Sequence, residues 1–297
     1  MINTYSQSTR HSAYLFLTPA LTAIGVFFFL PVLAALLMSF TDFDIYSLGD
    51  IKNARFIAFR NYSQLLQDPL FWKALKNTSY FVIIGVPLSI ATSLGTAVLL
   101  NSKLVKLKSL LRLAYFIPVI TTLVAVAVVW RYIYHPRFGL MNYLLELIGI
   151  NAIDWLGDPH WSMPALIILA VWKNFGYNMI IFIAGLQNIP LELYEAARID
   201  GASRWQQFRT ITLPMLAPTT LFITIITVIG YFQFFAEPYV MTRGGPLNST
   251  LSIVLYMYRE GFHSWKMGYS AAIAFILFFI VFLITLLQLR LQKARVV

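Results

Sequence analysis

Six long apolar stretches alternate with polar segments along this chain of 297 residues. A helix needs about 20 apolar residues to cross the hydrocarbon core of a bilayer, and each stretch is long enough. None shows the strict alternation of apolar and polar positions that marks a membrane β-strand. The pattern therefore predicts an all-α polytopic membrane protein. The six predicted spans are residues 13–38, 78–100, 113–134, 162–186, 215–238 and 269–290.

The first span resembles a signal peptide only in its position. It exceeds the roughly 7–15 apolar residues of a signal core, and it contains Pro19 and Pro31. We expect it to be kept as a membrane anchor.

Composition supports lipid as the surrounding medium. The chain is 59% hydrophobic and only 11% charged, whereas a soluble domain carries about 25% charged residues. It has no cysteine, which excludes disulfides and thiol chemistry, and its four histidines are scattered, which argues against a metal site. A net charge of +10 could indicate nucleic-acid binding, but basic membrane proteins usually carry this charge in cytoplasmic loops.

The basic residues also predict an orientation. With the N-terminus inside, the cytoplasmic segments hold eleven Lys and Arg in 59 residues, against ten in 102 outside. The nearly twofold density favours both termini in the cytoplasm. The clearest contributors are Lys103, Lys106, Lys108 and Arg112 in one loop and Arg290, Lys293 and Arg295 at the C-terminal end.

Lys173 is the only ionised side chain deep within a predicted span. A charge there costs at least ~2.5–3.5 kcal/mol unless it faces water or a partner. Two interpretations remain open: Lys173 lines a solute pathway, or it snorkels or pairs across the bundle.

Polar and aromatic side chains share one face on each of two spans. Hydroxyls, amides and aromatic rings in this arrangement suit a neutral polyhydroxylated solute, although threonine and asparagine also join membrane helices to one another. The residues are Asn174 and Tyr177 in the fourth span, and Thr224, Thr227, Tyr231 and Phe234 in the fifth.

No motif for energy conversion is present. The chain lacks a Gly-x-x-x-x-Gly-Lys-Ser/Thr phosphate loop, and its spans contain no carboxylate except Glu237 at an outer edge. Carriers driven by protons or sodium usually place an acid near mid-membrane. A self-energised carrier or channel stays the alternative from another class, but we expect another protein to supply the energy.

The polar loop of residues 187–213 has the features of a docking element. Glu192 and Glu195 favour the start of a helix, and Gly201 permits a sharp turn. An apolar stripe follows and ends before Pro214. A pair of helices lying on lipid headgroups would have a similar composition.

Several motifs lie in and around this loop. They are Glu195-Ala196-Ala197, Asp200-Gly201-Ala202, Leu213-Pro214, the lead-in Gly185 to Pro190, and Met241 to Pro246. Through these motifs the chain resembles the permease subunits of binding-protein-dependent ABC importers along almost its whole length, and it resembles their carbohydrate branch and the maltose-type first subunit in particular. It departs from the maltose permease itself, whose extra N-terminal spans and large outer domain we do not expect here.

The resemblance implies roles for specific residues. It implies coupling to an ATP-binding subunit for Glu195, Ala196, Ala197, Asp200, Gly201 and Ala202. It implies a solute pathway along Asn174, Tyr177, Thr227, Tyr231 and Phe234, with Lys173 beside them.

The resemblance also implies an assembly. We expect one transmembrane permease domain over residues 1–297, a six-helix bundle in a bacterial inner membrane. Its expected partners are a second homologous permease, two ATP-binding subunits and an external solute-binding protein. ATP and magnesium would bind the partner ATPase, and this chain would be a transporter subunit with no catalytic residue, cofactor or metal of its own. The expected solute is a sugar, an oligosaccharide or a polyol glycoside, and Lys173 leaves glycerol-3-phosphate or a related phosphorylated polyol as the alternative.

Overall fold

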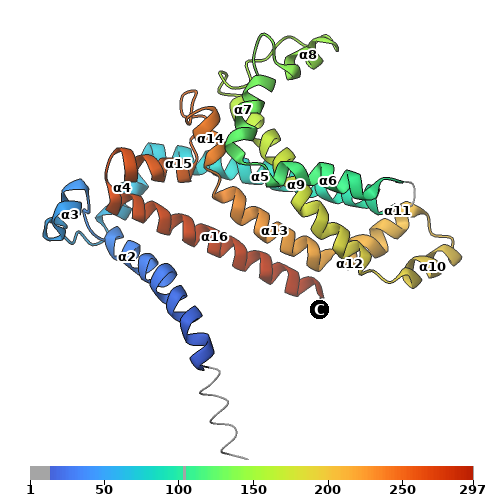
Figure 1. Cartoon of the computed structure of the whole chain (residues 1–297), viewed down its shortest axis with the longest axis horizontal. Coiled ribbons are helices and arrows are strands. Elements are labelled where there is room, and N and C mark those ends of the chain that lie inside the picture. The colour runs from blue at the N-terminus through green and yellow to red at the C-terminus, as the bar shows by residue number, and fades with distance from the viewer. Residues whose placement is uncertain (1–13, 103–104, 297) are drawn as a thin grey trace, which may run out of the picture. The chain divides into compact units, whose positions relative to one another are not determined.

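The structure, a computed structural model, describes residues 14–102 and 105–296 and consists almost entirely of helices (Figure 1). Among these residues the only β-pairing is one isolated bridge between Thr41 and Phe56. Lys103, used above for the orientation, lies outside the described residues. Five helices are long and apolar enough to span a membrane: Tyr14–Ser39, Pro69–Asn101, Ser162–Gln187, Ala217–Met241 and Met267–Leu291. The helical fold agrees with the prediction, and the orientation of the termini stays a prediction.

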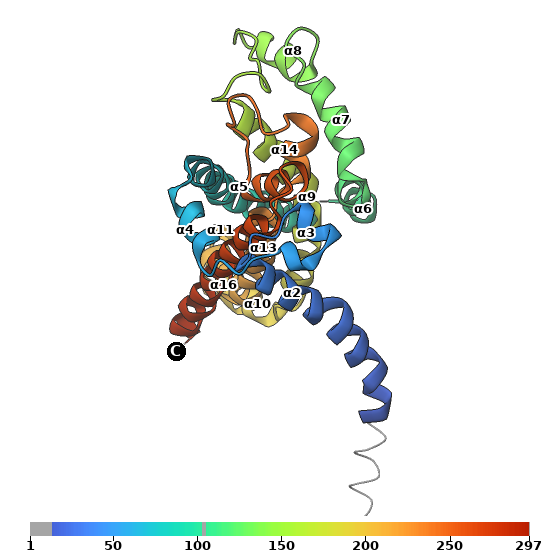
Figure 2. The same cartoon turned by 90° about the vertical axis from the view of Figure 1, so that its left-hand side faces the viewer.

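The third predicted span is broken. Helices α6 (Lys108–Ile120) and α7 (Leu123–Ile133) meet at an angle of 100°. Thr121 and Thr122 between them are extended. Figure 2 shows α7 leaving α6 in a new direction. Counted as one span, the pair brings the number of candidate membrane spans in the described residues to six.

The described residues form two compact units. The first contains residues 14–68 and 257–276. Asn61 organises it by donating hydrogen bonds of 2.8 Å to the carbonyls of Ser39 and Thr41. Gly268 packs against Thr41 and donates to the carbonyl of Phe43. Its helices are η1 (Gly25–Phe29), α2 (Leu30–Ser39), α3 (Ile45–Gly49), η2 (Ile51–Asn53), α4 (Arg60–Gln67), η4 (Arg259–His263) and the start of α16 (Met267–Val296).

The second unit contains residues 69–256 and 277–296. It includes α6 and α7, most of α15 and the later part of α16. Its other helices are α5 (Pro69–Asn101), α8 (Leu140–Glu146), α9 (Ser162–Gln187), α10 (Leu191–Ile199), α11 (Arg204–Gln207), η3 (Phe208–Thr212), α12 (Leu213–Met215), α13 (Ala217–Phe232) and α14 (Ala236–Met241); α15 comprises Ile253–Tyr258.

Helix α9 is the centre of the second unit and packs on α5, α6 and α13. Small residues spaced by four on α5, namely Gly85, Ser89, Ser93 and Ala97, are buried. Small residues allow membrane helices to approach closely. The approach is close enough for the Ser93 hydroxyl to donate to the Phe175 carbonyl of α9 at 3.0 Å.

One hydrophobic cluster joins α5, α9 and the start of α13. It extends from the middle of α9 to the chain that precedes α10, so the middle of the bundle and the polar loop share one packed core. Its fully or nearly buried members are Ala97, Leu100, Met179, Phe182, Ile183, Leu186, Ile189, Leu216 and Ile223.

Candidate functional site

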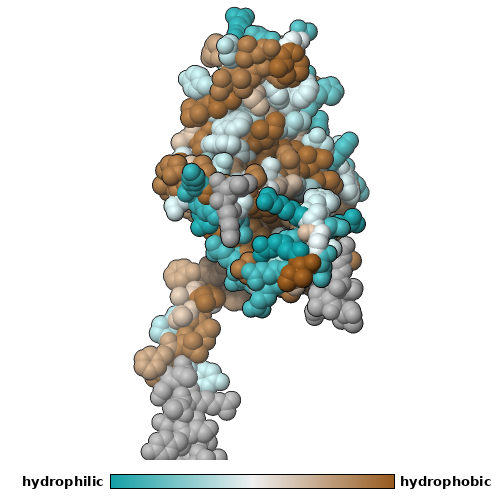
Figure 3. Space-filling model, turned by 90° about the vertical axis from the view of Figure 1, so that its right-hand side faces the viewer, coloured by the Kyte–Doolittle hydropathy of each residue, from teal (hydrophilic) through white to brown (hydrophobic). Residues whose placement is uncertain are grey.

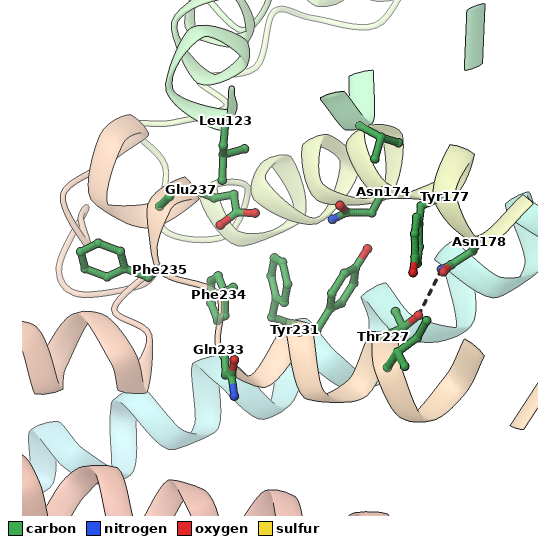
Figure 4. Close-up of a pocket in the computed structure, with 15 residues that line it drawn as sticks. Leu123, Asn174, Tyr177, Asn178, Thr227, Tyr231, Gln233, Phe234, Phe235 and Glu237 are labelled. Atoms are coloured by element: carbon green, nitrogen blue, oxygen red, sulfur yellow. Dashed lines mark hydrogen bonds between the residues drawn. The ribbon is translucent and has the colours of Figure 1, made fainter. Parts of the chain in front are cut away.

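A cavity of about 520 Å³ lies between α9, α13 and α14, with one side formed by α5 and by the ends of α6 and α7 (Figure 4). Its size falls in the range of small-molecule sites. The lining residues are Phe81, Val119, Leu123, Asn174, Tyr177, Asn178, Ile226, Thr227, Gly230, Tyr231, Gln233, Phe234, Phe235, Ala236 and Glu237.

Helix periodicity places the polar lining on α9. Tyr177 and Asn178 lie three and four positions after Asn174, so both share a face with it. Asn178 is buried and donates to the hydroxyl of Thr227 on α13 at 3.1 Å. This bond joins α9 to α13 in the wall of the cavity, so Thr227 and Asn178 serve both packing and lining.

Aromatic rings form another part of the wall. The rings of Phe81 and Phe234 are stacked with centroids 3.9 Å apart, and the Tyr231 ring lies 5.1 Å from Phe81. A Cβ at Gly85 would approach the Tyr231 ring to 2.8 Å, so glycine at this place on α5 makes room for the tyrosine.

Among the described residues, the hydroxyl of Tyr231 has no hydrogen-bond partner, although the residue is only 5% exposed. It interacts with Ser89 and Asn174 without meeting the geometry of a hydrogen bond. Figure 4 shows the side chain reaching from α13 toward α9. A buried polar group without a partner is costly, so this hydroxyl is a candidate to bind a solute group, and that role stays a prediction.

Five of the six predicted pathway residues therefore come together around one cavity. They are Asn174, Tyr177, Thr227, Tyr231 and Phe234. Their contact with a solute stays a prediction.

Lys173 is not part of the lining. Its Nζ donates to the carbonyls of Pro118, Val119 and Thr121 at 3.1, 3.3 and 3.1 Å. It therefore binds the break between α6 and α7, which corresponds to the pairing interpretation that the sequence left open.

Sequence reasoning missed most of the other lining positions, and three of them show why. Asn178 could have been found because it lies four residues after Asn174 on the same helical face. Phe81 belongs to α5, and only the packing of distant segments brings it here. Glu237, placed at an outer edge from the sequence, is buried and lines the cavity from α14.

The polar loop folds as two helices joined by a tight turn. α10 ends at Ile199, and Gly201 has a φ of +75°. The amide of Ala202 then donates to the carbonyl of Ala197 at 2.8 Å, which closes the turn. α11 begins with a capping box between Ser203 and Gln206. The predicted arrangement of helix, glycine turn and helix is therefore present.

The loop presents apolar side chains to its surroundings. Ile199 is 86% exposed and Trp205 is 68% exposed, and the Trp205 ring stacks on Phe208. Figure 3 faces the end of the molecule that carries α10 and α11, where isolated hydrophobic patches lie among hydrophilic side chains.

The coupling residues lie around this turn. Glu195, Ala196, Asp200 and Gly201 are exposed, whereas Ala197 and Ala202 are half-buried beneath them. The hydroxyls of Tyr194 and Thr212 are 2.9 Å apart and connect α10 to η3. The loop is thus an ordered surface, and its coupling role stays a prediction.

Comparison with known proteins shows which family the chain belongs to. Residues 94–296 match the family model described as "Binding-protein-dependent transport system inner membrane component". This chain belongs to that family. It is therefore an inner-membrane transport subunit and not an enzyme.

Two relatives match along nearly their full length. The arabinooligosaccharides transport system permease protein AraP of Halalkalibacterium halodurans is 37% identical over 98% of this chain and 90% of its own length. The lactose transport system permease protein LacF of Rhizobium radiobacter is 37% identical over 96% of this chain and 95% of its own.

The fold also has a counterpart among solved structures. A chain in the crystal structure of a bacterial ABC transporter involved in the import of the acidic polysaccharide alginate matches with a TM-score of 0.79. The match covers 98% of both chains at 23% identity. This similarity supports the ABC importer permease fold.

Proposed function

We propose that this chain is one transmembrane half of an ATP-driven importer for a neutral sugar or oligosaccharide. The observation that carries the proposal is the buried, unpartnered hydroxyl of Tyr231 in a cavity that also offers amide groups and aromatic faces. A sugar needs both kinds of surface, since its hydroxyls form hydrogen bonds and its C–H faces pack on aromatic rings.

The charge of the lining favours an uncharged solute. Among the described residues, Glu237 is the only ordinarily ionised side chain that lines the cavity, and a carboxylate at this place would repel an anion. The names of the relatives AraP and LacF, which refer to arabinooligosaccharides and lactose, support the carbohydrate class.

A phosphorylated polyol is the weaker candidate. That candidate depended on Lys173 as the cation that binds phosphate. An ammonium group has three N–H donors, and all three carbonyl partners of Lys173 belong to the chain itself. An incoming phosphate would have to displace these bonds.

The proposed assembly has a second permease, two ATP-binding subunits and an external solute-binding protein, with ATP and magnesium on the ATPases. Both termini and the α10–α11 loop lie on the cytoplasmic side. The exposed apolar side chains of Ile199 and Trp205 would enter a cleft on an ATPase. Closure of the ATPases would move this loop and switch the pathway between inward-facing and outward-facing states.

The test is a measurement of ATP hydrolysis. The chain is expressed together with its partner subunits, and the complex that copurifies with it is reconstituted in proteoliposomes. The solute-binding protein is then added. We expect a neutral sugar from a panel of mono- and oligosaccharides to stimulate hydrolysis and to enter the vesicles. Stimulation by glycerol-3-phosphate alone would refute the neutral-sugar proposal, and a chain that copurifies with no ATPase would refute the importer assembly.

A further inference from the structure

The break between α6 and α7 leaves backbone carbonyls without helical partners. Thr121 and Thr122 are extended, so the amides that directly follow Thr121 do not continue the helical hydrogen-bond pattern. The Thr121 amide still donates to Ile117, and the Val126 amide donates to Thr122. Between these two bonds, the carbonyls of Pro118, Val119 and Thr121 need another donor, because unsatisfied backbone groups are strongly disfavoured at membrane depth.

Lys173 supplies that donor from α9. Its three hydrogen bonds go to these three carbonyls. They match the three N–H groups of an ammonium, so the side chain is fully used. A positive charge at the C-terminal end of α6 also complements the negative end of that helix dipole.

A second contact one turn along α9 holds α6 in place. A Cβ at Gly176 would collide with the carbonyl oxygen of Tyr115, so the two backbones touch there. The ring of Tyr115 meets Phe175 edge to face at 5.5 Å. Gly176 therefore fixes the body of α6 on α9, and Lys173 fixes its end.

The break borders the cavity on both sides. Val119, before it, and Leu123, after it, both line the cavity. Asn174, the neighbour of Lys173 in the sequence, lines it as well. A change in the angle between α6 and α7 would therefore move two wall residues together.

We propose that Lys173 is a positioning residue that clamps the α6–α7 break in its bent form and so sets one wall of the cavity. It acts through the backbone carbonyls and does not contact the solute. This role depends on the geometry of the chain and holds whichever solute is carried.

Distance measurement between two spin labels tests the clamp. Because the chain has no cysteine, Leu110→Cys on α6 and Tyr132→Cys on α7 provide two unique labelling sites. Both side chains are well exposed, at 59% and 67%. A continuous straight helix would separate these backbone positions by about 33 Å at 1.5 Å per residue, whereas the 100° bend makes the separation much shorter.

The labelled chain is studied in its complete complex in lipid nanodiscs by double electron–electron resonance. With Lys173 present we expect one narrow distribution well below the straight-helix distance. Lys173→Met keeps the length of the side chain but removes the donors, and we expect the narrow peak to be lost in favour of longer, broader distances. Lys173→Arg keeps charge and donors and should retain the peak.

Lys76→Met is the matched control, since it removes an exposed lysine from α5 that lies outside the break and should leave the peak unchanged. An unchanged distribution in Lys173→Met, or a straight-helix distance in the parent, would overturn the proposal. If Lys173→Met fails to assemble, assembly of Lys173→Arg with the parental peak supports the clamp. Failure of both variants contradicts it.

Discussion

Removal of the Tyr231 hydroxyl distinguishes an effect on solute binding from an effect on the stability of the fold. Tyr231→Phe keeps the ring that packs on Phe81 and fits over Gly85, and it deletes only the oxygen. That oxygen is buried and has no hydrogen-bond partner in the part of the chain that the structure describes. The substitution therefore removes no internal hydrogen bond and relieves a desolvated polar group, so we expect stability to stay equal or to rise.

The effect on solute handling follows from the bond that the hydroxyl would make. A neutral hydrogen bond contributes about 0.5–1.5 kcal/mol net. At 25 °C this corresponds to a roughly 2- to 13-fold weaker apparent affinity for the solute. We expect the solute concentration that half-saturates transport to rise by this factor, while ATP hydrolysis without solute stays at the parental rate.

Tyr134 provides the reciprocal control. Its hydroxyl is buried, donates to the Ala165 carbonyl at 2.9 Å and lies outside the cavity lining. Tyr134→Phe breaks an existing hydrogen bond, so it should lower the apparent thermal midpoint of the complex and leave the half-saturating concentration unchanged.

Both variants are compared in proteoliposomes loaded with ATP, with uptake measured at graded concentrations of the stimulating sugar and a fixed concentration of binding protein. Thermal midpoints are measured on the same preparations. The reasoning fails if Tyr231→Phe transports with the parental half-saturation, because the free hydroxyl would then have no role in binding. It fails equally if Tyr231→Phe is the less stable variant of the two.

Substitutions at three glycines extend the test to other parts of the fold. Gly176→Ala should destabilise the complex by about 1–3 kcal/mol, since the new Cβ would meet the Tyr115 backbone. Gly95→Ala on α5, where the Cβ meets nothing within 4 Å, should be neutral or stabilising, and equal thermal midpoints for the two would refute this account. Gly201→Val places a β-branched residue at a φ of +75° and should reduce solute-stimulated ATP hydrolysis, whereas Gly201→Asn, which tolerates this φ, should retain more of it. A similar loss of solute-stimulated ATP hydrolysis in both variants would indicate that side-chain bulk, and not the backbone conformation at residue 201, causes the loss.

The sequence predicted the spans well because apolar length is a direct physical requirement of the bilayer. It failed to separate α6 from α7, since residues 113–134 are predominantly apolar and hide the break. The local signals were present: Pro118 withholds a backbone donor, and Thr121 and Thr122 are β-branched. These signals alone do not establish a break. The bent form also depends on hydrogen bonds from Lys173, which lies more than fifty residues further along the chain.

The candidate site could likewise be predicted only in part from the sequence. Residues that share a helical face, such as Tyr177 with Asn174 and Tyr231 with Thr227, could be grouped by spacing alone. The depth of Glu237 could not be predicted, since it depends on where α14 packs after the chain leaves α13. Nor could the sequence distinguish a lysine that faces solute from one that binds carbonyls, because both need the same apolar surroundings.

Helix α9 offers a physical route between the loop and the cavity. Asn174, Tyr177 and Asn178 lie on it, and it ends at Gln187, just before α10. Between these points Phe182 and Leu186 are packed into the cluster that also holds Leu216 at the start of α13. Packed cores move as units rather than deforming continuously. Displacement of the α10–α11 loop would therefore carry α9 and the start of α13 together and would shift two cavity walls at once. The bent α6–α7 pair, held to α9 through Lys173, would follow the same movement.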